Sequence, residues 1–213
     1  MIEMLVVLAI ISIITLVVIT SQSAFNRTLL LANAAYDVAL TMRSAQSYGV
    51  GSRVGAGISR AGYGLSFDRS KPNSFVFFAD STPGPSTSST SCHPATDITA
   101  PDAKAGNCAY ESATDTKIAD YQLPRRFIFQ DFCTYSGGSW QCANSNGSTV
   151  SRLDIVFVRP DPSPYISKNG SFSTTVPVTK ACITLASPEG WVRHISVSSS
   201  GEVAADASAC PLP

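Results

Sequence analysis

The sequence predicts an α+β protein, in which one long N-terminal α-helix packs against an antiparallel β-sheet and disulfides hold the loops. Three observations lead to this fold class. No glycine occurs before Gly49 and no proline before Pro72, so neither helix-breaking residue interrupts the start of the chain. Further along, apolar and polar residues alternate with the period of β-strands, and all six cysteines lie in this later part. We therefore divide the 213 residues into an N-terminal helix at 1–50 and a β-rich head domain at 51–213.

The first half of the predicted helix, at 1–22, suits a membrane. From Met4 to Ile19 there is no charged residue, proline or glycine. A helix of this length spans about 24–29 Å, just enough for the hydrocarbon core of a bilayer. A cleavable signal peptide would carry a basic residue before its apolar run, whereas the first one here is Arg27. A buried core helix would be less uniformly apolar in a domain of this size. We therefore expect a membrane anchor.

Glu3 is the only charged residue before Arg27. A carboxylate at the edge of an apolar helix costs roughly 2.5 kcal/mol or more in lipid unless it is paired or reaches water. Two interpretations are open from the residues alone. Glu3 extends to the interface and has no further role, or it pairs with a group on a neighbouring subunit. In the second case the buried pair forms only at the correct stagger, so it sets the register between subunits.

The second half of the helix, at 23–50, is amphipathic. Apolar residues recur at spacings of four, four, four and three, as one helix face requires: Leu30, Ala34, Val38, Met42 and Ala45. We expect this face to pack on the sheet and the helix to run from about residue 2 to Tyr48. Gly49 and Gly51 would then end it by adopting positive φ. The glycines at 49–55 lack the spacing of a phosphate-binding loop and follow a helix instead of a strand.

Period-two patterns in the head domain predict about six short strands. These stretches are 63–67, 74–79, 126–130, 153–158, 181–186 and 191–197. Turn residues at 68–73 and the sequence Ser-Pro-Glu-Gly at 187–190 predict two hairpins. Residues 81–91 are of low complexity and predict a surface loop, followed by an irregular insertion to about Ile118.

An even number of cysteines, all after the apolar run, predicts an oxidising compartment and disulfides. Zinc sites use close pairs such as C-x-x-C, and no two cysteines here are closer than nine positions. Six cysteines allow fifteen connectivities. Pairing nearest neighbours gives Cys92–Cys108, Cys133–Cys142 and Cys182–Cys210. The middle pair flanks a turn with two adjacent glycines, which favours a bridge there.

The composition excludes several classes of function. The formal net charge is zero and only 14% of residues are charged, so nothing indicates a nucleic-acid partner. Arg125 and Arg126 are the only adjacent basic pair, and the tail from Glu202 to Pro213 has no lysine or arginine. We therefore do not expect DNA binding.

No motif predicts catalysis, a cofactor or a metal site. His93 and His194 have no partner at the spacing of metal ligands. Asp154, Asp161 and Asp206 likewise form no calcium-binding pattern. Nucleophile-elbow, zinc-protease and EF-hand motifs are missing from the sequence. We do not expect an enzyme.

Residues Ile2 to Ile13, IEMLVVLAIISI, resemble the N-terminal helix of type IV pilins and of the pseudopilins of type II secretion systems. The resemblance covers residues 1 to about 25. In that family a basic leader ends in glycine, a dedicated peptidase cuts after it, and the new N-terminus, usually phenylalanine, is methylated. This glycine and phenylalanine are absent here. We expect either that the sequence begins slightly late or that its N-terminus is processed unusually.

The resemblance implies a pilin-like fold and a structural function. The helix would hold the subunit in the cytoplasmic (inner) membrane with its head outside. Assembly machinery would then extract it into a homopolymeric helical filament, either an extracellular pilus or a periplasmic pseudopilus. Glu3 would face the α-amino group of a neighbouring subunit. The remaining assembly contacts would come from the residues around it, namely Met1, Met4, Leu5, Leu8 and Ile11.

Two alternatives remain open at this stage. The first is a minor pseudopilin at the tip of a secretion-system filament, because the Gly-Tyr-Gly-x-x-Phe strand at 62–67 and the late hairpin loosely resemble those of H-type minor pseudopilins. The second is a membrane-tethered binding or enzymatic domain that never polymerises. The copy number of the chain in purified filaments separates the first alternative from a major subunit, and the effect of Glu3→Ala tests the second.

Overall fold

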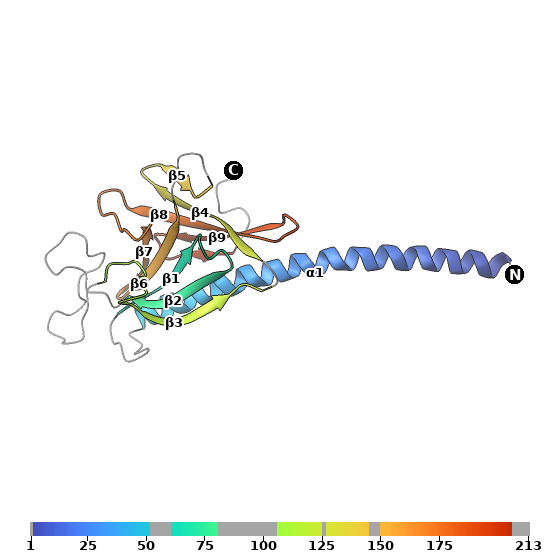
Figure 1. The fold of residues 1–213 in the computed structure, drawn as a ribbon, viewed down its shortest axis with the longest axis horizontal. Coiled ribbons are helices and arrows are strands. Elements are labelled where there is room, and N and C mark those ends of the chain that lie inside the picture. Colours follow the sequence, from blue (N-terminus) through green and yellow to red (C-terminus); the bar gives the residue numbers. More distant parts are fainter. Residues whose placement is uncertain (1, 52–60, 81–105, 125–126, 145–149, 206–213) are drawn as a thin grey trace.

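The computed structural model describes residues 2–51, 61–80, 106–124, 127–144 and 150–205, with residues 20–24 described by their backbone alone. One helix, α1 (Ile2–Val50), extends over 49 residues. Its second half carries the head domain, and its first half projects beyond the head into open space (Figure 1). The predicted helix is therefore confirmed almost to the residue, since Tyr48 lies within two residues of its end.

The head contains ten strands among the described residues, arranged in two antiparallel sheets. The first sheet has the order β3-β2-β1-β6-β7 and the second the order β10-β9-β8-β4-β5. The strands are β1 (Gly62–Asp68), β2 (Ser74–Asp80), β3 (Thr116–Gln122), β4 (Ile128–Ser136), β5 (Ser139–Cys142), β6 (Arg152–Val158), β7 (Asp161–Lys168), β8 (Val178–Ala186), β9 (Val192–Ser198) and β10 (Val203–Ala204).

The α+β class is confirmed, but the predicted single sheet is wrong. Strands far apart in the sequence pair with each other: β1 pairs with β6, and β4 pairs with β8. Alternation of apolar residues shows which side chains share a face, but it does not determine which strands become neighbours. The two predicted hairpins, β1–β2 and β8–β9, are both present because their strands are adjacent along the chain.

One hydrophobic core lies between the two sheets and the second half of α1. Four of the five predicted helix residues, from Ala34 to Ala45, are buried, whereas Leu30 is half-buried. An aromatic contact links the sheets, since Phe67 on β1 lies against Phe129 on β4 with ring centroids 5.2 Å apart. Within the first sheet Phe67 also stacks on Phe75 of β2, at 5.5 Å. The helix is thus held by both sheets and not by one face of a single sheet.

The outer face of the first sheet is also covered. Residues 106–115, which we call the strap, cross this face and complete a second apolar cluster of Phe78, Cys108, Val156 and Val158. The buried carboxylate of Asp80 fixes the start of the strap, since its Oδ2 accepts a hydrogen bond from the Cys108 backbone N–H at 2.8 Å. Consequently β6 is buried on both faces.

Gly49 has a different function from the predicted one. It remains within α1, and neither Gly49 nor Gly51 has positive φ. A Cβ atom at Gly49 would lie 2.3 Å from the carbonyl oxygen of Phe157 on β6, far inside contact distance. The glycine is therefore required for close approach of helix and sheet, a constraint that only the tertiary structure reveals.

Four strands were not predicted: β3, β5, β7 and β10. β3 and β7 are edge strands of the first sheet. β3 carries Lys117 and Asp120 on exposed positions, and β7 contains Pro162 and Pro164, which edge strands tolerate. Such strands lack a regular apolar alternation. The strand predicted at 126–130 begins at Ile128 and continues as β4 to Ser136.

The disulfide between Cys133 and Cys142 is present and joins directly opposed residues of β4 and β5. The predicted glycine turn between these strands is present, and both Gly137 and Gly138 have positive φ. Cys108 and Cys182 are also disulfide-bonded. Their predicted partners Cys92 and Cys210 lie outside the described residues, so these two pairings stay predictions.

Candidate functional site

The N-terminal half of α1 exposes a long apolar surface outside the head. Residues Ile2–Ile19 form a continuous helix with a mean hydropathy of 3.0, and none of this window is buried by the rest of the chain. The segment is long and apolar enough to cross a membrane, although an N-terminal signal sequence would meet the same criteria. Leu5 and Leu8, two of the predicted assembly residues, are 67% and 61% exposed.

Polar groups within this segment are satisfied by the helix itself. The hydroxyl of Ser12 donates to the carbonyl oxygen of Leu8 at 2.8 Å, and that of Thr15 donates to the carbonyl oxygen of Ile11 at the same distance. Back-bonding of this kind removes the need for water. The surface that the segment presents from Met4 to Ile19 is therefore apolar.

Glu3 lies in the first turn of α1, on an exposed position. A carboxylate there interacts favourably with the positive end of the helix dipole, worth about 0.3–1 kcal/mol. This local effect is small beside the cost of placing the charge in lipid. The side chains of Met4 and Ile11 are likewise exposed, while Met1 lies outside the described residues.

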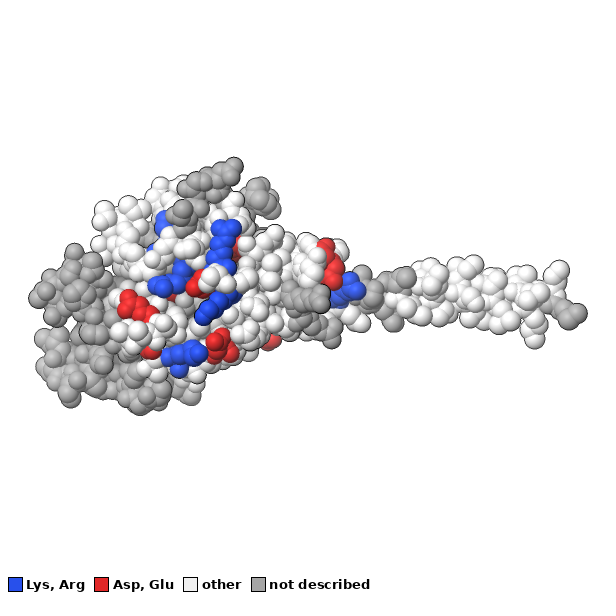
Figure 2. All heavy atoms as spheres, viewed as in Figure 1, with Lys and Arg blue, Asp and Glu red and all other residues white. Residues whose placement is uncertain are grey.

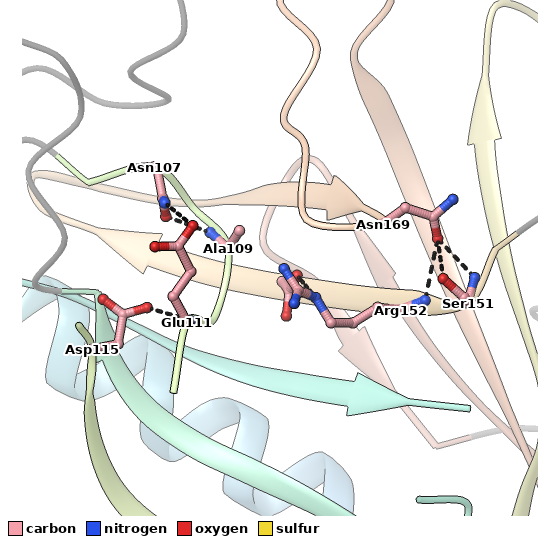
Figure 3. Close-up of polar contacts among 8 residues, drawn as sticks. Asn107, Ala109, Glu111, Asp115, Ser151, Arg152 and Asn169 are labelled. Atoms are coloured by element: carbon pink, nitrogen blue, oxygen red, sulfur yellow. Dashed lines mark hydrogen bonds and ion pairs between the residues drawn. The ribbon is translucent and has the colours of Figure 1, made fainter. Parts of the chain in front are cut away.

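A second candidate site lies on the head, where the strap meets the first sheet. A cavity of about 460 Å³ opens there between β1, β2, β6 and the strap. Four charged side chains line it: Asp68, Lys71, Glu111 and Arg152. The strap is held in shape by its own hydrogen bonds, including one from the Glu111 backbone N–H to Asp115 Oδ2 at 2.8 Å. Figure 3 shows the strap residues beside Arg152 of β6.

Asp154 is fully buried beside this cavity. It lies between Ser66 on β1 and Ser167 on β7, which are its cross-strand partners. The Arg152 Nε–H donates to Asp154 Oδ2 at 2.9 Å, whereas Oδ1 accepts no well-formed hydrogen bond within the described part of the chain. Burial raises the pKa of Asp154 to about 6, because desolvation outweighs the Arg152 charge and the polar groups of Ser66 and Tyr110.

Arg152 is oriented by its surroundings. Its backbone N–H and that of Ser151 both donate to the side-chain oxygen of Asn169, at 3.2 and 2.7 Å (Figure 3). The arginine side chain is 28% exposed, so one end reaches solvent while Nε contacts the buried carboxylate. The sequence showed no calcium-binding pattern around Asp154, and no motif drew attention to Arg152. The signal that could have identified this site is an acidic residue, Asp154, within the apolar strand predicted at 153–158.

The other residues singled out from the sequence do not form a site. His194 on β9 hydrogen-bonds through Nδ1 to the Thr184 hydroxyl at 3.0 Å, and burial lowers its pKa. Asp161 starts β7 at the surface, where the Ser163 N–H lowers its pKa. The remaining candidates lie outside the described residues: His93, Asp206, Arg125 and Arg126.

One group of potential metal ligands lies close together within the described residues. Oxygen and sulfur atoms of Asp131, Cys133 and Cys142 lie within 4.8 Å of one another. The two sulfurs are bonded to each other, so they are not thiolate ligands. The group offers a single carboxylate and does not constitute a metal centre.

Comparisons with known proteins found no match to this chain. No family model matches the chain, no curated protein matches it, and no solved structure matches its fold. What the chain itself establishes is an α+β head with two antiparallel sheets and a disulfide, carried on an apolar N-terminal helix that could serve as a membrane span or a signal.

Proposed function

We propose that this chain is a structural subunit of a type IV pilus-like filament, anchored in the membrane by its N-terminal helix before it polymerises. One observation carries the proposal: the head packs against the second half of α1 and leaves Ile2–Ile19 unburied. A helix that exposes this surface needs another environment. Lipid is the first candidate and sister helices are the second.

The size of the exposed surface supports this. Fourteen large apolar side chains between Ile2 and Ile19 are about half to three-quarters exposed. Burying such side chains is worth roughly 2 kcal/mol each, or on the order of 30 kcal/mol for the segment. Transfer from lipid into a bundle of like helices keeps most of this stabilisation. A subunit can therefore leave a membrane for a filament without exposing the segment to water.

Glu3 gives the packed state a defined register. The segment contains no other charge, so a carboxylate that enters the bundle is stabilised only where a positively charged group of a neighbour faces it. This is the role that the resemblance to type IV pilins assigns to Glu3. A pseudopilin of a secretion system would use the same contact. The copy number of the chain in purified filaments separates a minor from a major subunit.

The test uses cells that produce the chain. Shearing should release surface filaments in which mass spectrometry finds this chain as the main protein. Glu3→Ala should lower its amount in the sheared fraction while the membrane fraction retains it, because the anchor is intact and the register contact is lost. Glu202→Ala, which removes an exposed acid of the head, is the matched control and should assemble normally. Equal assembly of both variants would refute the role of Glu3.

The second candidate is a membrane-tethered binding domain. The cavity of about 460 Å³ beside the buried Asp154 favours it, because buried acids with raised pKa values gather at functional sites. This candidate predicts that Glu3→Ala leaves the location and activity of the chain unchanged, and that the chain is never recovered in polymers.

A further inference from the structure

Of the described head, the turn between β8 and β9 extends furthest along α1 toward its apolar N-terminal half (Figure 1). Here Arg27 of α1 and Glu189 of the turn form an ion pair at 3.0 Å. Figure 2 shows one basic and one acidic group in contact at this end of the head. The ion pair places the turn at the level of residue 27 on the helix.

Two large aromatic side chains are exposed close to this ion pair in the sequence. Trp191 directly follows the turn and is 52% exposed, while Phe25 on the helix is 64% exposed. Two hydrogen bonds with Ser187 fix the backbone of Trp191 in the turn. The Ser187 N–H donates to the Trp191 carbonyl at 2.9 Å, and the Trp191 N–H donates to the Ser187 hydroxyl at 3.2 Å. We call Phe25, Arg27, Glu189 and Trp191 the collar.

The backbone of the collar lies just above a lipid headgroup layer, within reach of a long side chain. The span Ile2–Ile19 is about 27 Å long, a little shorter than a typical hydrocarbon core of roughly 30 Å. Arg27 lies eight residues beyond Ile19, or about 12 Å along the axis. The edge of the core therefore falls roughly 9 Å below Arg27, and the headgroup layer is roughly 5–8 Å thick on each side. A bulky side chain in the collar reaches this layer.

We propose that the collar contacts phospholipid headgroups while the subunit is anchored in the membrane, with the Trp191 ring in the interfacial layer and Arg27 near the lipid phosphates. Tryptophan and arginine are both favoured at this depth, since an amphipathic ring and a long cationic side chain each have one apolar and one polar part. The contact would fix how the head stands on the membrane surface. The proposal rests on the anchored stage of the proposed function and does not depend on polymerisation.

The test measures the fluorescence of Trp191 in the full-length chain. Trp140→Phe removes the other tryptophan, which lies on β5 and contacts only the ring of Tyr135 among the aromatic pairs of the described head. The protein is reconstituted into phosphatidylcholine–phosphatidylglycerol vesicles at a ratio of about one chain per thousand lipids, so that copies rarely meet. Some lipids carry a nitroxide at a shallow acyl position. Trp191→Phe, which retains Trp140, is the matched control.

Trp191 emission should shift to the blue on reconstitution, and shallow nitroxide lipids should quench it about twofold or more. Trp140 emission should be unaffected. Vesicles that float with the protein while Trp191 remains fully accessible to aqueous iodide would overturn the collar proposal and leave the anchor intact. Protein that fails to float would overturn the anchor itself. If Trp191 is shielded from iodide only at high protein density, the collar contacts a second copy of the chain. That result would also contradict the lipid contact.

Discussion

Replacing Asp154 by asparagine should stabilise the head at neutral pH. Asparagine keeps the size of the side chain and an oxygen that can accept the Arg152 hydrogen bond, but it removes the buried charge. Arg152 remains partly exposed, so losing its ionic partner leaves a charge that water can still solvate. The ion pair does not compensate fully for desolvation, which is the common outcome for buried pairs.

The magnitude follows from the pKa. Folding raises the pKa of Asp154 from 3.8 to about 6, and each pKa unit corresponds to about 1.4 kcal/mol, so the ionised group costs on the order of 3 kcal/mol. Below the unfolded value of 3.8 the carboxyl is protonated in both states and this cost is absent. Stability falls as the pH rises from 3.8 through about 6, and it is level above that range. The stability of Asp154→Asn should not show this decrease between pH 3.8 and about pH 6, because asparagine does not ionise.

The assay is urea unfolding of the full-length chain in a mild non-ionic detergent at about pH 7.5 and about pH 4. The variant should be more stable than the parent by up to about 3 kcal/mol at the higher pH, and the difference should shrink at the lower pH. Asp120→Asn, an exposed acid on β3, should change stability by less than about 0.5 kcal/mol at both values. A variant that is less stable at neutral pH, or a difference independent of pH, would refute the reasoning.

Two further predictions concern contacts that stabilise the head: the packing of Gly49 on β6 and the disulfide between β4 and β5. Gly49→Ala should destabilise the head by about 1–3 kcal/mol or more, because the added methyl group overlaps the Phe157 carbonyl. Ser47→Ala, on the exposed side of the same helical turn, is the control and should have little effect in the same urea titration. Replacing Cys133 and Cys142 together by serine should cost about 2.5 kcal/mol, as expected for opening a loop with a separation of nine residues. A loss below about 0.5 kcal/mol in either experiment would contradict the corresponding contact.

The helix was predictable because its signals are local. An uninterrupted run without glycine or proline and a buried face from Ala34 to Ala45 depend only on neighbouring residues. The β1–β2 and β8–β9 hairpins were predictable for the same reason, since turn residues such as Gly190, with φ of +87°, specify them. The Cys133–Cys142 bridge likewise follows from a short glycine turn.

Non-local features were not predictable from these patterns. The pairing of β1 with β6 separates the head into two sheets, and it depends on which faces find partners in three dimensions. The close approach of Gly49 to Phe157 and the burial of Asp154 likewise depend on segments that are far apart in the sequence. The ion pair between Arg27 and Glu189 joins residues 162 positions apart. No periodicity within either segment indicates such contacts.

The most direct test of the account is whether the apolar segments of different copies touch. A photoreactive benzoylphenylalanine in place of Leu8, which is 61% exposed, should on irradiation of the producing cells yield a ladder of multimers that contain only this chain. The ladder should weaken strongly when Glu3→Ala is combined with the same probe at equal membrane levels. Cross-links to lipid alone, with the chain remaining monomeric in sheared and membrane fractions, would contradict the proposed filament.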